Sequence, residues 1–157
     1  PGGAKPILSL IHLLKLTNCK IISDRVYGFY NDFNIDVDPY EAGDEIKIFS
    51  KYKPQYIFTG TSYTSKIELK FIFEARLRNI KTFSFIDHYT SFSERFLLSN
   101  KYVLPETIFV TDEKSKKIAQ SSSVLKKLKV IVLGNYYHKY LKNWHPTIEK
   151  KLFFFRI

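Results

Sequence analysis

The sequence has one cysteine, no methionine, six glycines and six prolines among its 157 residues. Cys19 cannot form an internal disulfide and has no companions at metal-ligand spacing, which excludes a disulfide scaffold and a cysteine-based zinc site. No apolar run approaches the roughly 20 residues that a membrane-spanning helix needs. A secretory signal pattern is also missing from the N-terminus. We therefore expect a cytoplasmic protein.

The residues that are abundant indicate a folded domain. Hydrophobic residues make up 45%, aromatic residues 17% and charged residues 25% of the chain. This composition can bury a core and excludes a disordered or collagen-like chain. The length fits one domain of ordinary size.

Positive charge is concentrated in the last third of the chain. Residues 1–112 carry 14 Lys and Arg against 13 Asp and Glu, whereas residues 113–157 carry 11 against 2. The net charge of +10 therefore comes almost entirely from the C-terminal part. Such a basic face is either a solvated surface or a surface that attracts anionic lipid headgroups or a phosphorylated ligand.

Helix-like and strand-like segments alternate along the chain. The expected strands are Cys19–Ser23, Gln55–Thr59, Lys81–Ile86, Thr107–Thr111 and Lys129–Leu133. The expected helices are Ile7–Leu14, Pro39–Tyr52, Ser65–Arg78, Ser93–Ser99, Ser115–Ser121 and Tyr136–Lys142. Strands that alternate with helices at this spacing favour βαβ units and a parallel sheet. We predict an α/β fold with a single doubly wound, mostly parallel sheet.

The residue patterns at both ends of the sequence are typical of internal segments of a longer chain. Pro1–Pro6 is typical of a loop that follows a strand, and Lys151–Ile157 is typical of a strand just entered. We expect a domain over residues 1–142, followed over 143–157 by a connector and the first strand of a second domain.

Polar and glycine residues follow the predicted strands. In a doubly wound sheet the ligand crevice lies beyond the carboxyl ends of the strands. The candidate binding residues at these exits and just after them are Gly2, Gly3, Lys5, Thr61, Ser62, Tyr63, Glu94, Arg95 and Asn135. Gly2 and Gly3 could present backbone N–H groups to a phosphate, with Lys5 adding charge, although a plain tight turn is the alternative. The P-loop and dinucleotide fingerprints are absent.

Asp87 and His88 are the candidate catalytic residues. Histidine titrates near neutral pH, and a neighbouring carboxylate can orient it or raise its basicity. The two side chains can pair only if the strand has ended by Ile86, because consecutive residues on a strand point to opposite faces. A capping carboxylate beside a structural histidine is the alternative. No metal site and no cofactor are expected, because no histidine or carboxylate cluster has metal-ligand spacing.

These segments, taken in order, resemble the N-terminal half of GT-B glycosyltransferases of bacterial surface polysaccharide synthesis. The resemblance covers most of the chain. It is carried by Pro1–Pro6, Lys53–Ser62, Glu68, Ala75-Arg76, Asn79–Thr82, Asp87-His88-Tyr89, Arg95-Phe96, Leu104–Asp112 and Val130–Tyr136. UDP-N-acetylglucosamine 2-epimerases share much of this Rossmann-like outline.

The resemblance implies the acceptor-binding half of a nucleotide-sugar-dependent glycosyltransferase in surface polysaccharide or glycolipid synthesis. Asp87 or His88 would deprotonate an acceptor hydroxyl, and Thr61 with Ser62 would bind sugar hydroxyls. A missing C-terminal domain or a partner subunit would bind the donor, so the chain should be inactive alone. The acceptor would be a sugar or a lipid-linked sugar, which places the protein in the cytoplasm or peripherally at the inner face of the membrane.

Two alternatives stay open. The first is a nucleotide-sugar epimerase or hydrolase on the same fold. The second is a non-catalytic basic binding module, for which nucleic acid is a disfavoured partner because the excess charge is lysine and no recognised motif interleaves it.

Overall fold

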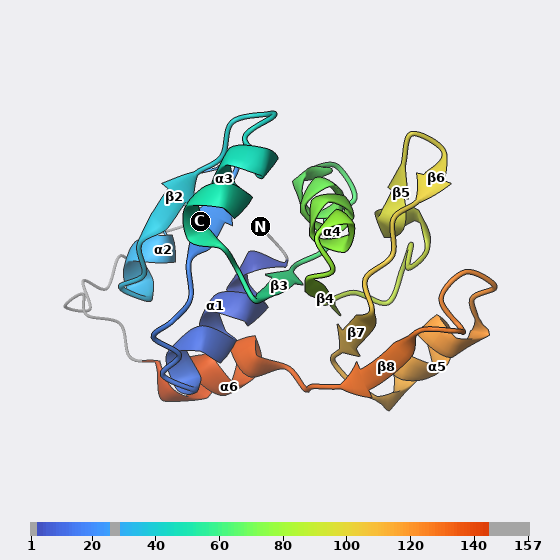
Figure 1. Ribbon diagram of the computed structural model, residues 1–157. Helices are drawn as coiled ribbons and strands as arrows, with labels where there is room; N and C mark the ends of the chain where they lie inside the picture. The colour runs from blue at the N-terminus through green and yellow to red at the C-terminus, as the bar shows by residue number, and fades with distance from the viewer. Residues whose placement is uncertain (1–2, 26–28, 145–157) are drawn as a thin grey trace, which may run out of the picture.

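The computed structural model describes residues 3–25 and 29–144. Its first half contains α1 (Ala4–Leu13), β1 (Ile21–Ser23), α2 (Phe29–Asp32), β2 (Val37–Pro39), α3 (Glu45–Tyr52), β3 (Tyr56–Thr59) and α4 (Ile67–Leu77). Its second half contains β4 (Lys81–Ile86), the 3₁₀ turn η1 (Glu94–Phe96), β5 (Leu97–Leu98), β6 (Lys101–Tyr102), β7 (Thr107–Val110), α5 (Glu113–Ser121), β8 (Lys129–Val132) and α6 (Tyr136–Asn143). Figure 1 shows their arrangement. No helix in the described ranges is both long and apolar enough to cross a membrane.

A four-stranded parallel sheet in the order β3-β4-β7-β8 forms the centre of the molecule. Each strand pairs in parallel with the next, with Phe58 opposite Phe83, Phe85 opposite Phe109, and Phe109 opposite Ile131. Parallel neighbours need a crossover connection. α4 connects β3 to β4, α5 connects β7 to β8, and the segment with η1, β5 and β6 connects β4 to β7. The predicted α/β class with a mainly parallel sheet is confirmed.

The main core lies between this sheet and the helices α4 and α5. Ile86, Ile108 and Val110 point from the sheet into it, and Ile72 of α4 and Ala119 of α5 meet them. All five side chains are fully buried. This apolar face fixes the pairing register of the strands, because a shift of one residue would turn the buried side chains to the opposite face.

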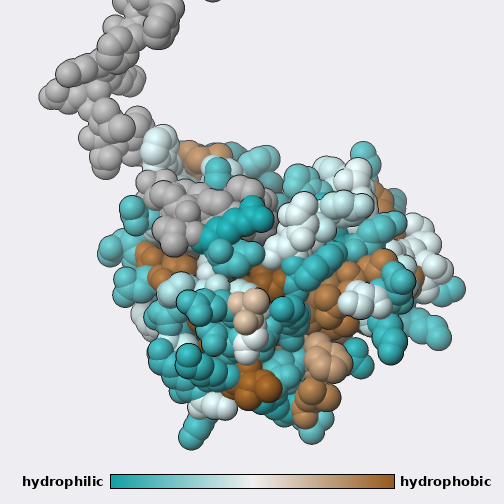
Figure 2. Space-filling view, turned by 90° about the horizontal axis from the view of Figure 1, so that it is seen from above, coloured by the Kyte–Doolittle hydropathy of each residue, from teal (hydrophilic) through white to brown (hydrophobic). Residues whose placement is uncertain are grey.

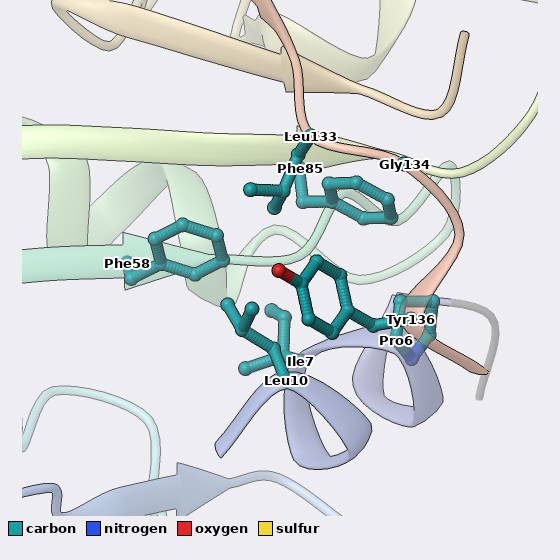
Figure 3. A pocket seen from close by; sticks show the side chains of 8 residues that line it. All are labelled: Pro6, Ile7, Leu10, Phe58, Phe85, Leu133, Gly134 and Tyr136. Atoms are coloured by element: carbon teal, nitrogen blue, oxygen red, sulfur yellow. The ribbon is translucent and has the colours of Figure 1, made fainter. Parts of the chain in front are cut away.

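Helices α1 and α6 pack together and lie against the opposite face of the sheet (Figure 1). There Phe58 of β3 and Phe85 of β4 meet Ile7 and Leu10 of α1 and Tyr136 of α6 (Figure 3). The chain therefore has the layered helix–sheet–helix arrangement of α/β proteins.

Two small sheets flank the central one. β1 pairs in parallel with β2, and β5 pairs with β6 as an antiparallel hairpin. β1, which the sequence placed in the one large sheet, thus lies in a two-stranded sheet of its own with β2, a strand that the sequence pattern did not predict.

The helix predicted over Ser93–Ser99 is wrong. A 3₁₀ turn over Glu94–Phe96 leads directly into the β5–β6 hairpin. Ser99 and Asn100 both have positive φ, at 46° and 62°. Two consecutive left-handed residues form the turn that suits a two-residue hairpin loop, and they cannot continue a helix.

The loop predicted over Pro1–Pro6 and the helix predicted from Pro39 also differ from the structure. α1 already begins at Ala4, so Lys5 and Pro6 lie in its first turn, where a proline is tolerated because that N–H has no helical acceptor. α3 begins only at Glu45, after a turn in which Gly43 has φ +99°. The predicted second domain at 143–157 lies outside the described residues from position 145 onward.

Truncation of Ile72 tests the main core. Ile72 is 0% exposed in α4, whereas Leu77 of the same helix is 65% exposed. We expect Ile72→Ala to lower the free energy of unfolding by about 2–5 kcal/mol and Leu77→Ala to change it by less than about 0.5 kcal/mol. Urea denaturation of both variants measures this, and similar losses in the two would contradict the proposed packing of α4.

Candidate functional site

A cleft of about 1110 Å³ opens between the ends of β1 and β3 and the start of α1. The predicted site residues that border it are Gly3, Thr61, Ser62, Tyr63, His88 and Arg95. They come from the start of α1 and from the segments that follow β3 and β4. The parallel sheet brings them together because its strands all end at the same edge.

Gly3 and Gly60 hold two of these segments in direct backbone contact. A Cβ on Gly3 would lie 2.9 Å from the Gly60 Cα and 3.0 Å from the Thr61 nitrogen. A Cβ on Gly60 would lie 3.0 Å from the Gly3 Cα. No other residue type fits without moving the backbone, so the start of α1 is fixed against the β3 exit.

The hydroxyl groups of Thr61 and Ser62 make local hydrogen bonds. The buried Thr61 Oγ1 donates to the Phe85 carbonyl at 3.1 Å. Ser62 Oγ accepts from the backbone N–H groups of Thr64 at 3.2 Å and Ser65 at 3.0 Å. Both side chains therefore shape the loop after β3, while Tyr63 is exposed beside it.

Arg95 is buried and stabilises the loop after β3 through hydrogen bonds from its guanidinium group. Its Nη1 donates to the Thr61 carbonyl at 3.1 Å, and its Nε donates to the Thr90 carbonyl at 3.3 Å. The guanidinium thus joins the β3 exit to the segment after β4, and it places a positive charge beside the cleft. Glu94, also a predicted binding residue, is exposed and does not border the cleft.

Asp87 and His88 follow β4, which ends at Ile86 as their pairing requires. His88 Nε2 lies 3.6 Å from Asp87 Oδ2. The Asp87 side chain is 10% exposed and the His88 side chain 58%. His88 borders the cleft, and the buried Asp87 Oδ1 has no hydrogen-bond partner among the described residues. A buried carboxylate oxygen without a partner is costly and is characteristic of functional sites.

Glu68, in the first turn of α4, is a cleft residue that the sequence analysis did not select. Its buried Oε2 has no hydrogen-bond partner in the described part of the chain. Burial, with a smaller contribution from the charge of Asp24, raises the pKa of Glu68 to about 7. The sequence contained a signal for the position of Glu68. Glu68 precedes the buried Ile72 by four residues, so the two lie on the same inward face of α4.

The remaining predicted residues lie elsewhere or are used structurally. Lys5 turns to α6, where its Nζ lies 3.4 Å from the Tyr137 hydroxyl. Asn135 caps α6 by accepting from the His138 N–H at 3.0 Å. Gly2 lies outside the described residues.

A side-chain hydrogen bond joins the segment after β4 to the segment after β7. The Tyr89 hydroxyl donates to Asp112 Oδ2, and Asp112 Oδ1 accepts from the Ser115 N–H at 2.8 Å as the cap of α5. These hydrogen bonds lower the pKa of Asp112 and keep it ionised. The exits of β4 and β7 are thereby linked beside His88.

Comparison with family models, with curated proteins and with solved structures gives no match to this chain. Within residues 3–25 and 29–144, no three His, Cys, Asp or Glu side chains are grouped so that they could hold a metal ion. The argument for function therefore depends on the fold and on the cleft.

Arg95 and Glu94 provide a matched pair for testing the support of the loop. We expect Arg95→Ala to lower the free energy of unfolding by about 2–3 kcal/mol, because the buried Thr61 carbonyl loses a charged donor. Glu94→Ala should change it by less than about 0.5 kcal/mol, since Glu94 is exposed. Chemical denaturation gives both values. Equal stability of the two variants would show that Arg95 does not support the loop.

The pKa of Glu68 predicts a dependence of stability on pH. The ordinary value of 4.5 applies in the unfolded chain and about 7 in the folded one. Between these values the folded state binds a proton that the unfolded state has lost, so stability falls as pH rises from about 4.5 to about 7. The total loss from this group is about 3 kcal/mol.

Glu68→Gln should remove this loss, so the variant gains stability relative to the wild type as pH rises through the same window. Thermal unfolding from pH 4 to 8 measures the difference. Glu41→Gln, at an exposed position, is the matched control and should parallel the wild type. A Glu68→Gln curve parallel to the wild type would contradict the raised pKa.

Proposed function

We propose that this chain is the acceptor-side domain of a nucleotide-sugar-dependent glycosyltransferase of the GT-B type, acting in surface polysaccharide or glycolipid synthesis. The observation that carries the proposal is the convergence of Gly3, the loop after β3 and His88 on one cleft at the carboxyl edge of a parallel sheet. Ligands bind at this place in open α/β sheets.

In this proposal His88 is the base and Asp87 positions it. The acceptor hydroxyl would transfer its proton to His88 as its oxygen forms a bond to the anomeric carbon of the donor sugar. The bond from that carbon to the phosphate oxygen breaks, and the nucleotide diphosphate leaves with the electron pair. The exposed ring of His88, with the buried Asp87 carboxylate 3.6 Å away, is suited to taking up this proton.

The start of α1 supports the stabilisation of negative charge. Gly3, the N-cap residue, places this helix N-terminus at the cleft. The partial positive charge of this helix end favours an anionic group such as a diphosphate. The nucleotide itself would be bound mainly by a further domain or a partner subunit.

The basic C-terminal third favours binding to an anionic membrane surface. Exposed lysines occur along α5, in the loop before β8, at the start of β8 and along α6: Lys114, Lys117, Lys126, Lys127, Lys129, Lys139 and Lys142. Each basic residue near an anionic bilayer contributes about 1 kcal/mol of attraction. A lipid-linked acceptor would be presented at such a surface.

The proposed activity is tested on the protein in its native form, with any subunit that purifies with it. Mass spectrometry of its reaction with nucleotide sugars should detect product only when a lipid-linked sugar acceptor is also present. Product formed from the donor alone would favour an epimerase or hydrolase. Binding to nucleic acid that falls steeply with salt, with no turnover, would favour a basic binding module.

His88 and His138 give a matched test of the catalytic assignment, because both are exposed histidines. We expect His88→Ala to lower kcat by about 100-fold or more, as loss of a general base does, with an unchanged melting temperature. His138→Ala should leave kcat within about twofold of the wild type. Equal turnover of the two variants would remove His88 from the mechanism.

A further inference from the structure

Arg95 is the most deeply buried charged residue in the described part of the chain. It is 8% exposed, and the other buried polar residues there are all serine or threonine. Polar residues otherwise lie intermixed with apolar ones at the surface, as Figure 2 shows for the side seen from above. Burial of a charge is costly, and arginine is almost never fully buried unless a partner compensates it. The partners of this guanidinium are therefore informative about function.

The protein supplies Arg95 with neutral partners only. Its Nε donates to the Thr90 carbonyl at 3.3 Å, and its Nη1 donates to the Thr61 carbonyl at 3.1 Å. These carbonyls satisfy N–H groups but carry no net charge. No carboxylate within residues 3–25 and 29–144 forms an ion pair with Arg95. The described side chains thus leave the positive charge of Arg95 without an opposite charge.

Nη2 is the part of the guanidinium that remains available to a ligand. Neither hydrogen bond of Arg95 with the described residues uses Nη2. Nη2 is also not among the fully enclosed polar atoms that lack a partner, and Arg95 borders the cleft. Together with the second N–H of Nη1, it offers two parallel donors. This geometry fits the two oxygens of a carboxylate or a phosphate.

The start of α1 adds positive potential at the same place. Thr61 joins the two features, because Arg95 Nη1 contacts its carbonyl and a Cβ on Gly3 would lie 3.0 Å from its nitrogen. Gly3 is the N-cap of α1, and the first turn of α1 has no acidic residue. A helix N-terminus carries a partial positive charge of about half an elementary charge. Two sources of positive potential therefore meet beside Thr61.

We propose that Arg95 is an anion-binding residue of the cleft, and that its guanidinium pairs with a carboxylate or phosphate group of the acceptor. The acceptor is then an acidic sugar or a sugar phosphate, and a neutral sugar is a poor ligand. The identification of this ligand as the acceptor rests on the proposed function. The anion site is tested by binding without turnover, so its failure and the failure of the proposed reaction are distinguishable.

The first experiment compares anionic and neutral probes on the protein in its native form. Isothermal titration calorimetry measures Kd for glucose, glucuronate, glucose 1-phosphate and inorganic phosphate. We expect at least one anionic probe to bind about tenfold or more tightly than glucose, because hydrogen bonds to a charged group contribute that much. The tighter of glucuronate and glucose 1-phosphate identifies the source of the anionic group. Failure of every anionic probe to bind more tightly than glucose would overturn the proposal.

Arg95→Gln and Arg76→Gln form a matched pair of variants. Glutamine removes the charge of Arg95 but retains an amide N–H for a neighbouring carbonyl. Arg76 is exposed and does not border the cleft. We expect Arg95→Gln to lose the preference for the anionic probe, while Arg76→Gln retains it within about twofold. A folded Arg95→Gln variant with the full preference would show that the guanidinium only stabilises the loop.

A measurement on the wild type keeps the test decisive if Arg95→Gln does not fold. Hydrogen exchange with mass spectrometry follows the amides of the loop after β3 and of the segment 90–95, with the tightest anionic probe at about ten times its Kd. We expect about tenfold slower exchange in both segments, because opening them must release the probe. Glucose at the same concentration is the control and should leave the rates unchanged. Equal rates with the anionic probe and with glucose would contradict the assignment of the anion to Arg95.

Discussion

Parallel pairing of β3, β4, β7 and β8 is the constraint on which the rest of the structure depends. Because these strands run in one direction, their carboxyl ends meet at one edge, and segments distant in sequence become neighbours there. The loop after β3, the Asp87-His88 segment and the start of α5 all lie at this edge. The helices α4 and α5 stabilise the arrangement by covering the face of the sheet that carries Ile86 and Val110.

The candidate site combines rigid backbone with incompletely satisfied polar groups. Gly3 and Gly60 are fixed in backbone contact, and the buried Arg95 holds the Thr61 carbonyl. Beside this frame, Asp87 and Glu68 each bury a carboxylate oxygen without a partner among the described residues. Binding sites commonly combine a rigid backbone with buried polar groups that lack hydrogen-bond partners. Such groups lower stability but are available to a ligand.

The order of residues along the sequence was enough to predict much of the candidate site. The strand Lys81–Ile86 was predicted with its observed bounds, so the position of Asp87 and His88 at its exit was also predicted. Asn135 was read as a binding residue because it follows a strand, but asparagine in that position equally suits a helix cap, and the cap is what the fold uses. Glu68 was missed because an acidic residue in a first helical turn is ordinary in any sequence.

The sequence by itself determined the alternation of helices and strands, because hydrophobic periodicity and turn residues are local properties. It also determined the concentration of positive charge in the last third. Only the tertiary structure decided which strands share a sheet, since pairing depends on contacts between distant residues. It alone separated β1 and β2 from β3, placed Gly3 against Gly60, and buried Glu68 deeply enough to raise its pKa. Burial and desolvation depend on how distant segments pack together, so no single segment of the sequence determines them.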